Sequence, residues 1–316
     1  MITIRAFDFP LSQALTHATS AAQSDRPACV LAMIGGAAGP SFRPVGASMF
    51  VMEDGTCFGG LSSGCIDGDV AHHAAQVLKD RKPRKLRYGQ GSPFMDIQLP
   101  CGGSLDIFLL PIDDITRLRA VSRSISERQP VTLSLDMEHG GIETVESEED
   151  QSVALHVLPD TRFVVLGAGT EASAFAAMAT SARYDAVLVS PDSDTLDAAR
   201  HAIPSLHTRH ITQATLPPDV AIDAHTAVTL FFHNHSWEPD ILLNILASPA
   251  FYIGAQGSLR TANARIETLR AAGVGEAELA RIKGPIGLIR STRDPRTLAV
   301  SVLAEVLSCE TPQGQN

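Results

Sequence analysis

The fold of the second half of this 316-residue chain is decided by the stretch Arg162-Phe163-Val164-Val165-Leu166-Gly167-Ala168-Gly169-Thr170-Glu171-Ala172-Ser173. An apolar run of strand length ends in a Gly-x-Gly-x-x-Ala turn, an alanine-rich segment follows, and a second apolar run begins at Ala186. Gly167 permits the tight turn, Gly169 lets the backbone approach a pyrophosphate, and Ala172 keeps the helix close to the sheet. The order strand, turn, helix, strand predicts a Rossmann-like doubly wound parallel sheet.

The residues around this turn leave its ligand open. A dinucleotide-binding loop pairs with an acidic residue about 20 residues further on, at the end of the second strand. Here Ser190 ends that strand, and Asp192, the candidate for this role, lies two residues later. Glu171 places a carboxylate in the first helical turn, where it competes with a phosphate for the positive end of the helix. NAD(P) or another nucleotide is therefore one open alternative for the ligand of this half.

Two cysteines in glycine-rich sequence mark the first half. Cys65 lies within Gly59-Gly60-Leu61-Ser62-Ser63-Gly64-Cys65-Ile66-Asp67-Gly68-Asp69, and Cys101 lies within Pro100-Cys101-Gly102-Gly103. Glycines beside a thiol remove side-chain bulk and let the backbone approach a ligand closely. Two thiols in open loops, joined to a nucleotide-type fold, indicate that the chain handles a large cofactor.

Apolar runs and turn signals predict a mixed α/β fold for the first half. Helices are expected over 11–22, 69–78 and 113–127, with Asp67 or Asp69 capping the second of them. Strands are expected over 28–34, 105–110, 131–137 and 153–158, with a β-hairpin around Asp54-Gly55. The acidic stretch 143–150 is expected to be a solvated turn. We therefore divide the chain into a cysteine-bearing domain, residues 1–158, and a Rossmann-like domain, residues 159–316.

Composition narrows the class of protein. Apolar residues make up 44% of the chain and charged residues 19%, which is typical of a folded globular protein. The formal net charge of −10 argues against general nucleic-acid binding, because phosphate contacts need a basic surface. The sequence has no recognisable signal peptide and no apolar run long enough for a membrane helix. Five cysteines, an odd number, fit reduced thiols in a cytoplasm better than a disulfide framework, and Cys29, Cys57 and Cys309 are expected in the core.

Two histidines follow an apolar run of the second half. His233 and His235 flank Asn234 just after residues 227–232. A solvent-facing loop is the plain interpretation, and a role in lining a cleft stays open, because ligands bind at the carboxyl ends of the strands in open α/β sheets. A metal pair is the alternative, but no third ligand is evident nearby, and no metal is predicted.

Two further polar stretches have both a plain and a functional interpretation. Ser258, Arg260 and Thr261 precede an expected helix at 262–271, and Gly254 and Gly257 clear space beside them. An arginine and two hydroxyls at a helix start predict an anion site, with ordinary N-capping by a hydroxyl as the alternative. The basic run 79–87 is expected to face water; the alternative is a docking patch or anion collector near the thiol loops.

Several of these motifs together resemble the xanthine dehydrogenase accessory protein family (XdhC/CoxI). The matching stretches in the first half are Pro44-Val45-Gly46-Ala47-Ser48-Met49, Gly59 to Val70, and Cys101-Gly102-Gly103. In the second half they are Val165 to Gly169, Phe251-Tyr252-Ile253-Gly254-Ala255-Gln256-Gly257-Ser258-Leu259-Arg260-Thr261, and Lys283-Gly284-Pro285-Ile286-Gly287-Leu288. The chain departs from the family pattern at Ser63, at Thr170-Glu171, at His233-Asn234-His235 and at Ile289-Arg290, mostly in the Rossmann-like half.

This resemblance implies a chaperone that binds molybdopterin-type molybdenum cofactor and hands it, in sulfurated form, to an apo-enzyme. The implied partners are a xanthine dehydrogenase-like molybdenum hydroxylase and a cysteine desulfurase, and family members tend to form dimers. Cys101 is the first candidate for cofactor contact and Cys65 the second, since a thiolate is a soft ligand. No catalytic residue is assigned. The candidate cofactor-binding residues are Cys101, Cys65, Gly102, Gly103, Gly64, Gly167, Gly169, Ala172, Asp192, His233, Gly254, Gly257, Ser258 and Arg260.

Two other functions stay open on the residues alone. An NAD(P)-dependent oxidoreductase would use the Rossmann-like half for hydride transfer, although Ser190 and Glu171 count against it. A thiol redox sensor would require Cys65 and Cys101 to approach disulfide distance. Neither a Ser-His-Asp order, a His-Glu-x-x-His motif nor a Walker loop is present, which favours the delivery protein.

Overall fold

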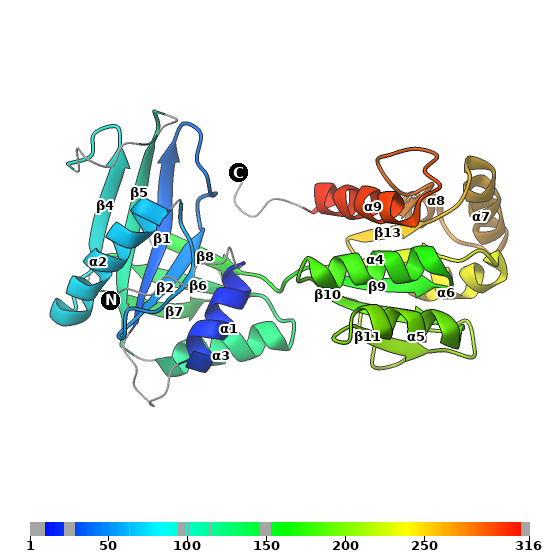
Figure 1. The fold of residues 1–316 in the computed structure, drawn as a ribbon, viewed down its shortest axis with the longest axis horizontal. Helices are drawn as coiled ribbons and strands as arrows, with labels where there is room; N and C mark the ends of the chain where they lie inside the picture. Colours follow the sequence, from blue (N-terminus) through cyan, green and yellow to red (C-terminus); the bar gives the residue numbers. More distant parts are fainter. Residues whose placement is uncertain are drawn as a thin grey trace. The chain divides into compact units, whose positions relative to one another are not determined.

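A computed structural model describes residues 10–21, 29–62, 64–93, 99, 102–113, 115–138, 140–145 and 153–310. The chain forms two compact units, one running to Pro159 and the other beginning at Asp160 (Figure 1). The first unit contains a five-stranded and a three-stranded sheet, the second a six-stranded sheet, and each unit has its own buried cores.

The first unit is built on a five-stranded antiparallel sheet of order β3-β2-β1-β5-β4. Its strands are β1 Cys29–Ala38, β2 Ser48–Met52, β3 Cys57–Gly59, β4 Arg84–Gly89 and β5 Ser104–Ile112. β2 and β3 form the hairpin expected around Asp54-Gly55, where Gly55 has a positive φ and its N–H donates to the carbonyl of Met52. Buried residues of helix α2, Gly64–Asp80, pack with side chains of β1, β4 and β5 in one apolar core.

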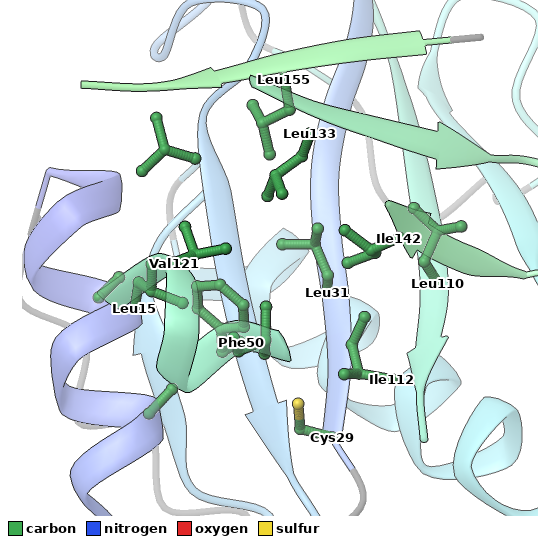
Figure 2. Close-up of a cluster of buried hydrophobic side chains, with 14 of the residues drawn as sticks. Leu15, Cys29, Leu31, Phe50, Leu110, Ile112, Val121, Leu133, Ile142 and Leu155 are labelled. Atoms are coloured by element: carbon green, nitrogen blue, oxygen red, sulfur yellow. The ribbon is translucent and has the colours of Figure 1, made fainter. Parts of the chain in front are cut away.

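A second core of the same unit joins this sheet to further helices and a small sheet. The elements are α1 Leu11–Ala21, α3 Ile115–Ser126, β6 Val131–Asp136, β7 Gly141–Val145 and β8 Val153–Val157. β6 lies between β7 and β8, and both pairs are antiparallel. Figure 2 shows Leu31, Phe50 and Leu110 of the large sheet facing Leu133 and Leu155 of the small one. Both faces of β1 are therefore covered, as its run of six buried residues requires.

Two expectations for this unit are wrong. Helix α2 begins at Gly64 rather than near residue 69, so Asp67 and Asp69 lie within the helix and do not cap it. The acidic stretch 143–150 begins within strand β7, whose Ile142 is buried while Glu143 and Thr144 are exposed; residues 146–150 lie outside the described part. With a single buried apolar residue, the strand shows too little alternation of apolar and polar residues to be predicted from the sequence.

The second unit is the expected doubly wound Rossmann sheet. Its strands are β9 Arg162–Gly167, β10 Asp185–Ser190, β11 His207–His210, β12 Thr226–Phe231, β13 Tyr252–Ala255 and β14 Ile282–Lys283. They are all parallel and run in the order β11-β10-β9-β12-β13-β14. Numbered along the chain this is 3-2-1-4-5-6, the order of dinucleotide-binding domains, with the topological switch point between β9 and β12.

Helices cover both faces of this sheet. One core contains residues of α4 Thr170–Ser181, α5 Ser193–Ala202 and α9 Pro295–Cys309. The other contains residues of α6 Glu238–Leu246, α7 Leu259–Ala271 and α8 Glu276–Leu279. The short helix η1, His235–Trp237, leads into α6. Close packing at the first turn explains two small residues: a Cβ on Gly167 would lie 2.5 Å from the carbonyl oxygen of Phe231, and Ala172 is completely buried.

Candidate functional site: the cysteine turn and the glycine loops

The strand register brings the end of β3 and the start of β5, next to Gly102 and Gly103, to one end of the five-stranded sheet. β3 ends at Gly59 opposite Met49, near the start of β2. β5 starts at Ser104, which is paired with both Ala38 at the end of β1 and Gly89 at the end of β4. The segment after β3 and the segment before β5 therefore emerge at the same end of the sheet.

A hydrogen bond ties helix α2 to this end. The hydroxyl of Tyr88 donates to Asp69 Oδ2 at 2.7 Å, and His73 Nε2 lies 3.6 Å from the same oxygen. Burial, followed by the bond to Asp69, raises the pKa of Tyr88, so the phenol remains a donor at neutral pH. Cys65 precedes Asp69 by four residues and shares its face of the helix, about one turn away.

Asp67 shapes the turn that leads into Cys65. Its carboxylate is 3% exposed, and Oδ1 accepts from the N–H groups of Leu61, at 3.2 Å, and Ser62, at 3.0 Å. This bond folds the segment after β3 back onto the first turn of α2. Cys65 itself is exposed, and a Cβ built on Gly64 would meet no atom within 4 Å. The thiol thus stands in the first turn of a helix with open space beside it, rather than in a loop.

The second stretch has one open glycine and one packed glycine. Gly102 has a φ of 70° and no atom within 4 Å of a Cβ placed on it, so it combines a left-handed backbone with open space. A Cβ on Gly103 would collide with the carbonyl oxygen of Ala38, so Gly103 is required by packing. The carbonyl of Gly103 accepts from the N–H of Gln90. Cys101 and Ser63 lie outside the described residues.

The remaining cysteines divide into two kinds. Cys29 and Cys57 are completely buried, as expected. Burial raises the pKa of Cys29 to about 12 and that of Cys57 to about 11, with Asp67 and Asp54 adding to the second shift. Cys309, expected in the core, is exposed near the end of α9. Among the described thiols, Cys65 and Cys309 are therefore the accessible ones.

In the Rossmann unit, the amide of the glycine turn already has a partner. The N–H of Gly169 donates to Thr195 Oγ1 at 2.8 Å, and the Thr195 hydroxyl in turn donates to Asp192 Oδ2. Asp192 is the N-cap of α5, and its carboxylate also accepts from the N–H of Thr195 at 3.0 Å. These two bonds from Thr195 lower the pKa of Asp192. The candidate ribose ligand is thus engaged in capping a helix.

A histidine and a carboxylate face the same turn. His233 Nε2 lies 3.2 Å from Glu171 Oε2, and Glu171 stands in the first turn of α4. A Cβ on Gly169 would lie 3.7 Å from atoms of both side chains. Anionic and imidazole groups therefore occupy the space where a Rossmann domain holds a pyrophosphate. His235 makes a different contact, 3.0 Å from Glu238 Oε1.

The last group of candidates surrounds the start of α7. Ser258 is the N-cap, and its Oγ accepts from the N–H of Thr261 at 3.1 Å, which agrees with the capping alternative. The helix begins at Leu259, three residues before the expected start. Gly257 has a φ of 143°, and a Cβ on Gly254 would lie 2.5 Å from the ring of Tyr252. Arg260 is exposed and lines a cavity.

The basic run extends from the last turn of α2 into strand β4, where Arg87 Nη2 donates to Ser104 Oγ at 3.3 Å, next to Gly103. Lys79 lies in the last turn of α2, roughly 20 Å along the helix from Cys65. Several of the charges are paired: Arg81 with Asp113, Arg84 with Asp80, and Lys85 and Arg87 with Asp106.

The described part of the chain has neither a cluster of metal-ligating side chains nor a membrane-spanning helix. No three His, Cys, Asp or Glu side chains of the described part gather closely enough to hold a metal ion. No described helix combines the length and apolar character needed to cross a bilayer.

Comparison with known proteins identifies the family. A model of the XdhC and CoxI family matches residues 22–89, and a model of the XdhC Rossmann domain matches residues 163–306. The molybdenum cofactor insertion chaperone PaoD of Escherichia coli is 32% identical over 310 residues, which cover 96% of this chain and 89% of PaoD. The chain belongs to the XdhC and CoxI family.

Two further matches agree with this assignment. The uncharacterised protein YqeB of Escherichia coli is 23% identical over 265 residues, covering 83% of this chain and 40% of YqeB. A crystal structure of a Bacillus halodurans protein described as a xanthine dehydrogenase has a TM-score of 0.72, with 21% identity, over 96% of this chain and 98% of that one. At this identity the second match shows the fold alone.

Sequence reasoning missed the residues that hold these sites in place. Tyr88 and Thr195 act through partners 19 and 26 residues away, and nothing local marks either one. Arg265 did leave a signal, because it lies at helical spacing between Ala262 and Leu269, on the buried face of α7. A charged residue in such a stripe requires a buried partner, which here is Glu238.

Proposed function

We propose that this family member binds molybdenum cofactor and delivers it to a molybdenum hydroxylase. The observation that carries the proposal is the exposed Cys65 in the first turn of α2, with open space at Gly64 and at Gly102 of the second glycine stretch. Full-length similarity to a molybdenum cofactor insertion chaperone supports it.

The residues present suit such a cargo. Thiolates are soft ligands for a soft metal or its terminal sulfur, and Cys101 and Cys65 would supply them. Backbone amides around Gly102 would bind phosphate or pterin oxygens. Protein side chains would hold and shield the cargo without general acid–base chemistry.

The oxidoreductase alternative finds no support in the family models or in PaoD. It also conflicts with the Rossmann unit itself, because the N–H of Gly169 is bonded to Thr195 and Glu171 stands beside it. A dinucleotide at this turn would have to displace both.

The proposal extends to a sulfur donor, an oligomeric state and a cellular location. A cysteine desulfurase would supply the terminal sulfur, and the chain would act as a homodimer in the cytoplasm, where exposed thiols such as Cys65 stay reduced. Size-exclusion chromatography with light scattering tests the dimer, and a mass of one chain would contradict it.

Cofactor content after purification tests the main proposal. We would produce wild type, Cys101→Ala, Cys65→Ala and, as matched control, Cys309→Ala, whose thiol is exposed on α9 of the other unit. Molybdenum and pterin are then measured after gel filtration. The proposal expects stoichiometric cofactor in wild type and control, and loss in Cys101→Ala, in Cys65→Ala or in both. Absence of cofactor from wild type, with NAD(H) retained instead, would contradict the proposal and favour the oxidoreductase.

A further inference from the structure

A cavity of about 270 Å³ lies at the carboxyl-end side of the Rossmann sheet, between α6 and α7. Helix η1 and α6 follow β12, and α7 follows β13, so the residues that open the cavity come directly after the ends of two neighbouring strands. This is the edge at which open α/β sheets bind ligands. The lining residues that matter here are His235, Glu238, Arg260, Thr261, Arg265 and Thr268.

A buried ion pair forms one wall of this cavity. Arg265 is 6% exposed and Glu238 is 2% exposed. Arg265 Nε donates to Glu238 Oε2 at 2.8 Å, and its Nη2 donates to Glu238 Oε1 at 3.1 Å and to the carbonyl of Gln256 at 2.8 Å. No described residue accepts from Nη1 of Arg265. The pair neutralises its own charge and leaves a fixed guanidinium donor group in the wall.

A second arginine adds charge that the described residues do not neutralise. Arg260 is exposed in the first turn of α7, lines the cavity, and has no acidic partner in the described part of the chain. The other described arginines near it are paired, Arg265 with Glu238 and Arg270 with Glu267 and Glu276. Beside Arg260, the hydroxyl of Thr261 lies 3.0 Å from that of Ser258.

The glycine turn offers no competing anion site. At α4 the N–H of Gly169 already donates to Thr195, and the Glu171 carboxylate repels an anion from the same helix end. At α7 the corresponding position carries Arg260 and hydroxyls, with no acidic residue in the first turn. The balance of charge at the two helix ends is thus opposite to that of a typical dinucleotide-binding domain.

From these observations we propose that the Rossmann unit binds a phosphate monoester in the cavity between α6 and α7. Arg260 contacts the phosphate oxygens, Arg265 Nη1 and the Thr261 hydroxyl complete the donor set, and Glu238 holds Arg265 in position. The unit does not use its glycine turn for this ligand. All of the proposed donors belong to the second unit.

Trp237 provides a readout for this proposal. It is the only tryptophan of the chain, lies between His235 and Glu238 of the cavity wall, and stacks on Phe232 with ring centroids 6.3 Å apart. We would titrate the full-length protein with inorganic phosphate, AMP and NAD, following tryptophan fluorescence and, independently, isothermal titration heat. Potassium chloride at equal ionic strength is the blank.

The matched variants are Arg260→Gln and Arg200→Gln. Arg200 is also exposed, but it lies on α5 and pairs with Asp197. Phosphate and AMP are expected to bind wild type and Arg200→Gln alike, and Arg260→Gln is expected to raise Kd about tenfold or more, because a charge-assisted contact is lost. If the nucleoside of AMP also contacts the protein, AMP binds more tightly than inorganic phosphate. If the two ligands bind with equal affinity, the site recognises the phosphate group alone.

Three results would overturn the proposal. The first is an equal response to chloride, and the second is unchanged phosphate and AMP binding in Arg260→Gln. The third is NAD binding that is weakened by Gly169→Ala and untouched by Arg260→Gln, which would restore the glycine turn as the site.

Discussion

At the scale of single residues, Asp67 determines the shape of the cysteine turn. Its buried carboxylate accepts two backbone N–H groups that would otherwise lack a partner. Asp67→Ala removes a charged acceptor and leaves both donors unsatisfied, so we expect a loss of about 3 kcal/mol in the free energy of unfolding. Urea unfolding followed by far-ultraviolet circular dichroism measures it.

Asp67→Asn separates the loss of the hydrogen bonds from the loss of the negative charge. Asp67→Asn keeps one carbonyl oxygen for the two N–H groups and should lose clearly less stability than Asp67→Ala. Asp54→Ala is a control, since the N–H that donates to Asp54 Oδ1, that of Thr56, is exposed. Equal stability of Asp67→Ala and Asp54→Ala would show that the two buried bonds contribute nothing.

The burial of each cysteine determines the reactivity of its thiol. The pKa of Cys29 is raised to about 12 and that of Cys57 to about 11, so both thiols stay protonated in the folded protein between pH 7 and 9. We expect iodoacetamide at pH 8 to modify Cys65 and Cys309 and to spare Cys29 and Cys57, as read by peptide mass spectrometry. Modification of Cys29 at the rate of Cys309 would contradict the burial described here.

At the scale of elements, local pattern explains what could be predicted. The hairpin at Asp54-Gly55 and the unit β9–α4–β10 were confirmed, because turn chemistry and apolar runs coincide there. The start of α2 was misplaced, because Gly64 and Gly68 are typical of a loop and Asp67 has the composition of a cap. The contact that fixes the helix start, from Asp67 back to Leu61, becomes visible only in three dimensions.

Two glycines, Gly59 at the end of β3 and Gly64 at the start of α2, differ in what substitution should do. Gly59 has a φ of 91°, and a Cβ there would collide with the carbonyl oxygen of Ser48, so Gly59→Ala should cost about 3 kcal/mol or more. Gly64 is helical with open space around it, so Gly64→Ala should gain about 0.5 kcal/mol.

The molybdenum content of Gly64→Ala tests whether the cofactor binds beside Gly64. If the space at Gly64 admits the cofactor, Gly64→Ala purifies with less molybdenum than wild type although it is more stable. Thermal unfolding and metal content are measured on the same samples. Full cofactor content in a stabilised Gly64→Ala would place the cargo away from this turn.

At the scale of the whole molecule, the parts that sequence could not supply are the long-range pairings. β1 pairs with β5, about 75 residues further along the chain, and only this pairing brings Gly102 to the same sheet end as the turn of Cys65. The Rossmann order was accessible because each parallel crossover is local and right-handed by rule. The Arg265–Glu238 pair joins residues 27 apart and required the packed helices to be seen.

The division into two units leads to a last prediction. The second unit has a six-stranded sheet with buried clusters of 19 and 16 residues on its two faces, all contributed by residues beyond Asp160. A domain of about 150 residues buries enough apolar surface to fold alone. We therefore expect residues 160–313, produced separately, to unfold cooperatively in urea and to keep the native emission of Trp237. The fragment should also bind phosphate with the affinity of the full chain, since every proposed donor lies within it. A fragment with non-cooperative unfolding and water-exposed tryptophan emission would show that the first unit is needed to complete this core.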